Sequence, residues 1–201
     1  STQMAMADGA SAEWLDRVQT DLQELEYEIR WQDRPVAPAV PPSWHAPNRA
    51  HGFRTYFTKE GPRVIPRTEP SSWQWGLRLA GFGPGNALLV VRPVVATAGA
   101  NRIQYDRGSL VEWYVNEPRG LKQGFTLGAP PEVEPGEKPL VLSFVLEGNL
   151  SPDVSADGQA IDFVMPEGTR ALRYAGLCVI DATGRELPAR MEGWSGRGAR
   201  G

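Results

Sequence analysis

The stretch EWYVNEPRGLKQGFTL, residues 112–127, contains two short segments of alternating side chains that are separated by a Pro–Arg–Gly sequence. Such alternation is typical of β-strands, and a turn sequence between two alternating segments predicts a hairpin. Proline presets φ for a turn, and glycine can adopt the left-handed conformation. The sequence therefore predicts a three-residue loop, residues 118–120, in which Glu117 pairs with Leu121.

This register sorts the hairpin into two faces. Trp113 and Phe125 fall on an inward apolar face, and Tyr114 covers Gly124 on the opposite face, as aromatic rings do over strand glycines. Glu112 falls on the polar face. General acid–base catalysis normally needs a second titratable group nearby, and the sequence nominates none. Glu112 is therefore expected to be a solvated or hydrogen-bonded sheet carboxylate.

The rest of the chain repeats the same signals. Short alternating runs follow one another from about residue 52, and the chain's 22 glycines and 18 prolines supply frequent breaks between them. This pattern predicts an all-β fold, an antiparallel β-sandwich of about eleven short strands. One domain over residues 11–192 is expected.

The N-terminal part is predicted to differ from this pattern. Ser11 is a good N-cap, and Trp14, Val18, Leu22 and Leu25 recur at helical spacing, which predicts one helix over residues 11–25. The Pro-rich segment 33–48 is expected to be an extended crossing segment, because proline is rare inside sheets. Residues 1–10 are interpreted as a tag or mature N-terminal tail, and 193–201 as a flexible, truncated C-terminal end.

Composition excludes several classes of protein. The formal net charge is −3 with a pI near 5.5, so there is no basic excess to indicate nucleic-acid binding. No apolar run approaches the roughly 20 residues that a membrane span needs. Cys178 is the only cysteine, and its place in the run LCVI predicts a small buried hydrophobic residue.

Three segments resemble a known family. They are IQYDRGSLVEWYVNEPRGLKQGFTL (103–127), LRYAGLCVIDATGRELPARME (172–192) and APNRAHGFRTYFTKEG (46–61). Together they resemble the β-rich domain that precedes the repeats in bacterial FG-GAP (integrin-like) and seven-bladed β-propeller proteins. The resemblance covers most of the chain.

The resemblance implies a bacterial, secreted or cell-surface module that is not an enzyme and carries no cofactor. Its expected partners are the C-terminal repeat domains of the same full-length protein, and another surface protein or a glycan is a further possibility. The alternative function is a carbohydrate-binding β-sandwich module that uses some of the seven tryptophans. The candidate contact residues for a partner are Trp44, Asn48, Arg49, Glu112, Asn116 and Arg119.

A calcium loop is the remaining candidate site. Asp153, Ser155 and Asp157 have the spacing that opens an EF-hand loop, but the twelfth position is Val164 rather than glutamate. The sequence DVSADG is better interpreted as an Asp-Gly hairpin turn. No metal site is therefore expected.

Overall fold

The computed structural model of the chain describes residues 14–15, 17–18, 25–37, 40–69, 72–85, 87–128 and 139–193. It is an all-β structure with antiparallel sheets, as the sequence predicts. The chain divides into two compact units. Unit 1 comprises Ser1–Ser72 and Gly76–Leu146, and unit 2 comprises Trp73–Trp75 and Glu147–Gly201. The predicted single domain over residues 11–192 stays a prediction.

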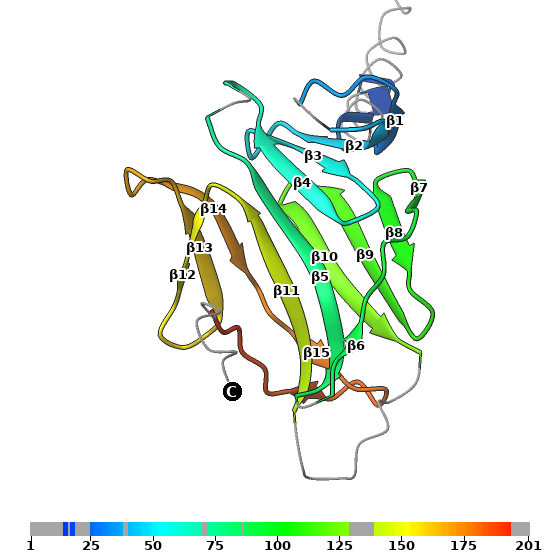
Figure 1. Cartoon of the computed structure of the whole chain (residues 1–201). Coiled ribbons are helices and arrows are strands. Elements are labelled where there is room, and N and C mark those ends of the chain that lie inside the picture. Colours follow the sequence, from blue (N-terminus) through cyan, green and yellow to red (C-terminus); the bar gives the residue numbers. More distant parts are fainter. Residues whose placement is uncertain are drawn as a thin grey trace, which may run out of the picture. The chain divides into compact units, whose positions relative to one another are not determined.

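Unit 1 contains most of a seven-stranded sheet and all of a four-stranded sheet (Figure 1). The first sheet has the order β1-β2-β3-β4-β5-β11, with β6 also paired to β5, and the second has the order β10-β9-β8-β7. The strands of the first sheet are β1 (Arg30–Gln32), β2 (Ser43–Asn48), β3 (Phe53–Phe57), β4 (Pro62–Pro66), β5 (Trp75–Pro84), β6 (Leu89–Val90) and β11 (Leu140–Gly148). Those of the second are β7 (Thr97–Gly99), β8 (Arg102–Asp106), β9 (Leu110–Glu117) and β10 (Gly120–Leu127).

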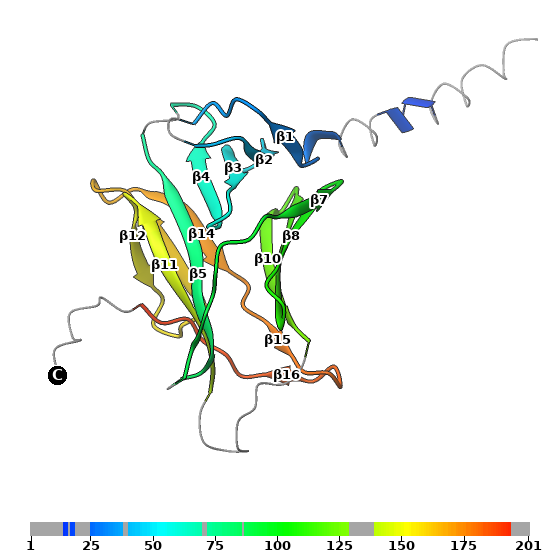
Figure 2. The same cartoon turned by 45° about the vertical axis from the view of Figure 1, so that its right-hand side comes forward.

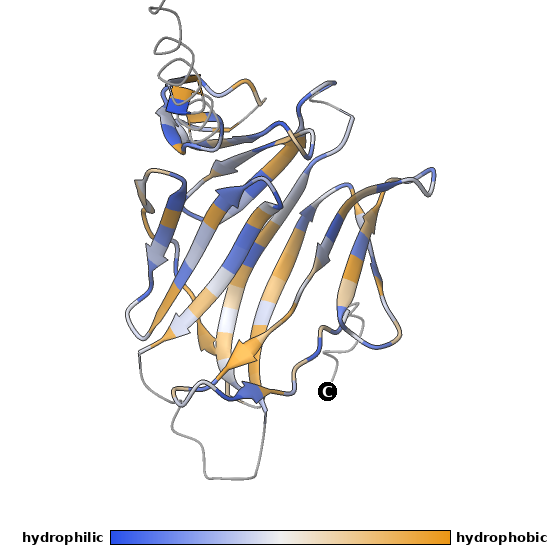
Figure 3. Ribbon diagram, turned by 180° about the vertical axis from the view of Figure 1, so that it is seen from behind, coloured by the Kyte–Doolittle hydropathy of each residue, from blue (hydrophilic) through white to orange (hydrophobic). Residues whose placement is uncertain are grey.

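These two sheets face each other and share their core (Figure 2). Phe57 on β3 packs in one cluster with Tyr105 on β8 and Tyr114 on β9. Leu79 on β5 packs in a second cluster with Leu110 on β9. Apolar area removed from water in such clusters stabilises the fold by about 25 cal/mol per Å². Hydrophilic and hydrophobic residues are mixed along the strands of the second sheet (Figure 3), as expected of a sheet buried on one side.

Unit 2 contains a three-stranded sheet and a two-stranded sheet. Its core includes Phe163, whose ring meets that of Trp75 edge-on with 5.3 Å between centroids. The strands are β12 (Ser151–Val154), β13 (Ala160–Val164) and β14 (Arg170–Ala175) in one sheet, and β15 (Val179–Ile180) and β16 (Glu186–Leu187) in the other.

The predicted eleven-strand sandwich with one N-terminal helix is not confirmed in that detail. The described residues form sixteen strands, several of them only two or three residues long. The described helical residues near the N-terminus are Trp14, Leu15, Arg17, Val18, Leu25 and Glu26. The rest of the predicted helix over residues 11–25 lies outside the described residues. The same holds for the predicted tail 1–10 and for the predicted C-terminal end apart from Gly193.

The prediction for the Pro-rich segment is wrong at its C-terminal half. Residues 43–48 form β2, which lies between β1 and β3 inside the sheet. Pro47 is tolerated there because β1 pairs only with residues 43–45 and has ended before Pro47. The carbonyl of Pro47 accepts a hydrogen bond from the Asn116 side chain at 2.8 Å, away from the ladder. A missing N–H on that side removes no strand-to-strand bond.

The predicted hairpin register is wrong by one residue. Glu117 pairs with Gly120 rather than with Leu121, so the loop contains two residues and Trp113 lies opposite Gly124. A slip of one residue exchanges the two faces of a strand. The side chain of Glu112 is therefore completely buried, and Trp113 lies on the outer, half-buried face. The prediction for Cys178 is also wrong, since its thiol is exposed.

Candidate functional site

The most unusual chemical feature of unit 1 is a buried carboxylate. Strands β8 and β9 form a hairpin in which Asp106 pairs with Val111. Arg107 begins the connecting turn, and its backbone N–H donates to the carbonyl of Leu110 at 3.0 Å. This turn brings Arg107 beside Glu112, and the exposed fractions of the two side chains are 4% and 0%.

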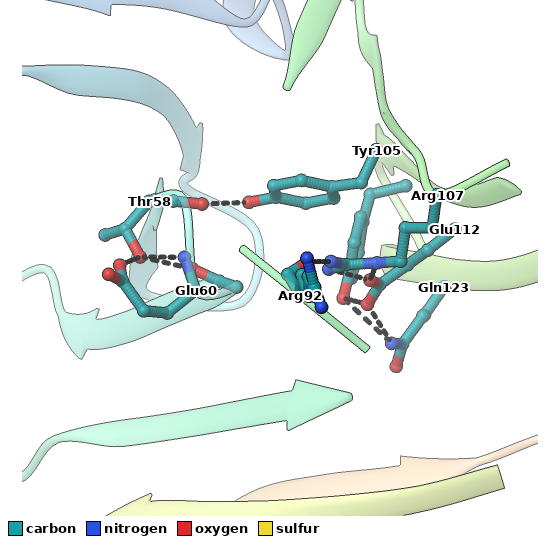
Figure 4. Close-up of polar contacts among 9 residues, drawn as sticks. Thr58, Glu60, Arg92, Tyr105, Arg107, Glu112 and Gln123 are labelled. Carbon is teal, nitrogen blue, oxygen red and sulfur yellow. Dashed lines mark hydrogen bonds and ion pairs between the residues drawn. The ribbon is translucent and has the colours of Figure 1, made fainter. Parts of the chain in front are cut away.

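The Glu112 carboxylate accepts four hydrogen bonds from neighbouring side chains (Figure 4). Arg107 donates to Oε2 from Nη2 at 2.6 Å and from Nε at 3.0 Å. On the other oxygen, Oε1, Tyr114 Oη donates at 2.6 Å and Gln123 Nε2 at 3.2 Å. Both carboxylate oxygens are thus occupied by donors of the same chain. We call these four residues the Glu112 network.

The network is tied, through neighbouring groups, to the segments that follow β6 and β3. Arg107 Nη1 donates to the carbonyl of Arg92 at 2.9 Å, and the guanidinium lies 5.0 Å from the Tyr105 ring centroid. Tyr105 Oη donates to the carbonyl of Thr58 at 2.8 Å (Figure 4). Burial, with a smaller contribution from the negative charge of Glu112, raises the pKa of Tyr105 well above its ordinary value of 10.0.

This geometry favours a structural role for the Glu112 network. A general base must reach a substrate proton, which requires a free lone pair and access from solvent. The Glu112 carboxylate has no exposed surface, and both of its oxygens accept hydrogen bonds from the protein. A buried charge that is paired and hydrogen-bonded is stable, whereas removal of its partner is costly.

Two of the predicted contact residues come together at one end of unit 1. Asn48 Nδ2 donates to Asn116 Oδ1 at 2.9 Å, and both side chains are completely buried. Asn116 Nδ2 donates to the carbonyls of Tyr27 and Pro47 at 3.0 and 2.8 Å. These amides therefore satisfy backbone carbonyls at Tyr27, Pro47 and Glu117, and they do not face solvent.

The other predicted contact residues do not join them in a single site. Trp44 is half-buried against the core, and its ring meets that of Trp31 at 79° with 5.7 Å between centroids. Arg49 is exposed and pairs with Glu26 at 3.3 Å. Arg119 is exposed in the β9–β10 turn, and Glu112 belongs to the network described above.

The candidate calcium residues lie on β12 and in the hairpin turn that connects it to β13. Asp157 Oδ1 accepts hydrogen bonds from Ser155 Oγ at 2.6 Å and from the Gln159 N–H at 3.0 Å, which lower the pKa of that carboxyl. Asp153 pairs across the strands with Asp162 beside a hollow of about 70 Å³. Arg173, which also lines the hollow, donates to both oxygens of Asp162 at 3.0 Å. Within the described ranges, no three His, Cys, Asp or Glu side chains form a possible metal site.

Sequence reasoning missed Arg107 and Gln123, which hold Glu112. The available signal was the turn sequence DRGS, which places Arg107 in the turn just before the alternating segment that contains Glu112.

No protein-family model, curated protein or solved structure matches the chain. No helix in the part of the chain that the structure describes has the length and apolar character needed to cross a membrane.

Proposed function

We propose that this chain is a non-catalytic structural or partner-binding module at the N-terminus of a larger bacterial repeat protein on the cell surface or outside the cell. Unit 1 would be its β-sandwich, preceded by the helix predicted over residues 11–25. The proposal rests on the family resemblance of residues 46–61, 103–127 and 172–192. The proposed partners are the repeat domains of the same protein.

The proposal that the module is non-catalytic rests on the burial and the hydrogen bonding of Glu112. This carboxylate is the most deeply buried acid among the described residues, and its hydrogen-bonding capacity is taken up by Arg107, Tyr114 and Gln123. The polar groups in the core of unit 1 thus hold segments of the fold together. Such an arrangement suits a rigid spacer or docking module.

The tryptophan geometry gives little support to the carbohydrate-binding alternative. Stacking on a sugar chain needs exposed rings that lie roughly parallel. Trp73 and Trp75 are each 8% exposed, and the rings of Trp31 and Trp44 are nearly perpendicular. Trp113 has Arg102 over its ring at 4.4 Å.

A glycan array combined with acrylamide quenching of tryptophan fluorescence tests this choice. We expect no saturable binding to neutral or acidic polysaccharides, and quenching of Trp14 and Trp31, which are 63% and 49% exposed. Trp14→Phe and Trp31→Phe variants assign the quenched fluorescence to these two tryptophans. Saturable binding to one polysaccharide that protects either tryptophan from acrylamide would replace the proposal with the carbohydrate-binding function.

The structural part is tested on the full-length protein. We expect deletion of residues 1–192 to lower the melting temperature of the repeat domains or the amount of protein displayed at the surface. A Glu117→Gln substitution in the intact protein controls for a nonspecific effect, because Glu117 lies outside the core on β9. Unchanged stability and display after the deletion would exclude a structural role.

A further inference from the structure

A strap covers part of the outer face of the first sheet. The strap, residues 33–37 and 40–42, connects β1 to β2. Its Val36 N–H donates to Tyr56 Oη at 3.3 Å, and Ala37 and Val40 pack against Tyr56 and Ile65. Tyr56 is completely buried. The strap is therefore held to the sheet mainly through one tyrosine and its neighbour.

His45 lies against the same tyrosine. It is opposite Tyr56 in the β2–β3 register, and the two rings are tilted by 33° with 4.9 Å between centroids. Only 8% of His45 is exposed. Its Nδ1 lies 3.1 Å from Nε2 of Gln32 on β1. The imidazole is thus enclosed by two neighbouring strands on the face that the strap covers.

Three polar atoms around His45 are buried and have no hydrogen-bond partner among the residues that the structure describes. They are His45 Nε2, Gln32 Oε1 and Ser43 Oγ. Gln32 and Ser43 pair directly across β1 and β2. Buried polar atoms without protein partners cost free energy that contact with water recovers. Opening of the strap would let water reach these atoms, so the closed face already carries a local free-energy cost.

The surroundings of His45 also disfavour a positive charge. Arg30 is its partner across β1, and Arg54 lies diagonally from it on β3. The strap's carboxylate, Asp33, accepts a hydrogen bond from Trp31 Nε1 at 2.9 Å. Other charged residues on or beside this face include Glu28, which binds Arg30, Arg34 in the strap, and Arg63 opposite Tyr56.

We propose that His45 makes the strap sensitive to acid, so that protonation of its imidazole releases residues 33–37 and 40–42 from Tyr56. A buried imidazolium beside arginines and without a carboxylate partner is unfavourable, and opening of the strap exposes it to water. The strand ladders of β2 and β3 do not pass through the strap, so they persist when it opens. This device is independent of the proposed function.

The size of the effect follows from linkage. Burial, and to a smaller degree the Arg54 guanidinium, lowers the pKa of His45 from 6.5 to about 4. The closed form therefore binds the proton less tightly than the open form, and acid favours opening between these two values. If opening restores the ordinary pKa, the ratio of open to closed strap rises about 20-fold from pH 7 to pH 5.

Amide hydrogen exchange followed by NMR tests the proposal. The protection factor of the Val36 amide, which corrects for the intrinsic effect of pH, is measured at pH 7 and pH 5. We expect a fall of about 20-fold in the native chain and little change in His45→Gln, which cannot take up the proton. The matched control is His51→Gln, since His51 is the only other histidine and is exposed. It should behave like the native chain.

Three results would overturn the proposal. An equal loss of Val36 protection in His45→Gln would show that another group responds to acid. A parallel loss of protection in the amides of β9 would show unfolding of unit 1 rather than opening of the strap. A His45 imidazole that titrates at 6.5 in the NMR chemical shifts of the native chain would show that closure of the strap does not disfavour the protonated form, and this measurement needs no variant.

Discussion

The indole of Trp113 lies directly on Gly124, its cross-strand partner in the β9–β10 hairpin. A Cβ built on Gly124 would meet Trp113 Cζ2 at 2.1 Å. An aromatic ring that covers a strand glycine shields the backbone and fills the space of the missing side chain. The sequence predicts this role for Tyr114, but the observed register assigns it to Trp113, and Tyr114 donates to Glu112 in the core.

Substitution of Gly124 by alanine should displace the Trp113 ring and lower the stability of unit 1. Overpacking of this kind costs about 1–3 kcal/mol. Urea unfolding followed by tryptophan fluorescence measures the loss. The control is Gly99→Ala in β7 of the same sheet, where an added Cβ meets no atom within 4 Å. Equal effects of the two substitutions would contradict the packing of Trp113 on Gly124.

Loss of the charge on Glu112 should destabilise the fold more than loss of any surface carboxylate. Glu112→Gln leaves the buried Arg107 guanidinium without its counter-charge, and breaking such a pair costs about 3–5 kcal/mol. Thermal unfolding monitored by circular dichroism checks the loss. Glu117→Gln on the same strand should change stability by less than about 0.5 kcal/mol. A small effect of Glu112→Gln would support the register with an outward Glu112 that the sequence predicts.

Alkaline solution should weaken unit 1 through Tyr105. The pKa of the Tyr105 phenol is raised in the folded chain, so its contribution to the free energy of unfolding is complete below pH 10.0. This contribution is lost as the pH rises toward the pKa of the phenol in the folded chain. Tyr105→Phe cannot ionise and should flatten this part of the pH profile. The same variant should lose about 1 kcal/mol at neutral pH, because the bond to the Thr58 carbonyl is missing. Parallel stability curves for both proteins above pH 10 would refute the prediction.

Gly148 should be essential for unit 2. Its φ is +101°, and an added Cβ would lie 2.1 Å from the carbonyl oxygen of Gln74. That carbonyl accepts a hydrogen bond from the Asn149 N–H at 3.1 Å, and Asn149 Oδ1 accepts one from the Gln74 N–H at 2.7 Å. Gly148→Ala should therefore open the amides of β13 to hydrogen exchange.

The control for this prediction is Gly168→Ala. Gly168 also has a positive φ, +88°, but an added Cβ meets nothing within 4 Å. Gly168→Ala should lower the free energy of unfolding by only about 1–2 kcal/mol, the cost of placing a residue with a side chain in the left-handed conformation. The difference between the two variants measures the steric overlap with Gln74, and no difference would mean that this overlap is relieved at no cost.

The pattern of the sequence was sufficient for the class of fold and for the position of many strands. Alternation in residues 102–106 and 110–117, and the Asp-Gly turn after Val154, are local signals that correspond to β8, β9 and the β12–β13 hairpin. The reason is that strand periodicity and turn conformation depend on neighbouring residues, which the sequence displays directly. The predicted function remains a proposal, since it rests on resemblance.

The sequence by itself thus determined an antiparallel all-β chain with hairpins at its Gly- and Pro-containing breaks. Only the tertiary structure decided which face of β9 points inward. Periodicity places the alternate residues Glu112, Tyr114 and Asn116 on one side, and their polar character predicts an outer face. The structure buries them because Arg107 satisfies Glu112, and Asn48 together with the Pro47 carbonyl satisfies Asn116. A polar side chain is stable in a core only when such partners reach it, and partners from distant segments meet only in the folded chain.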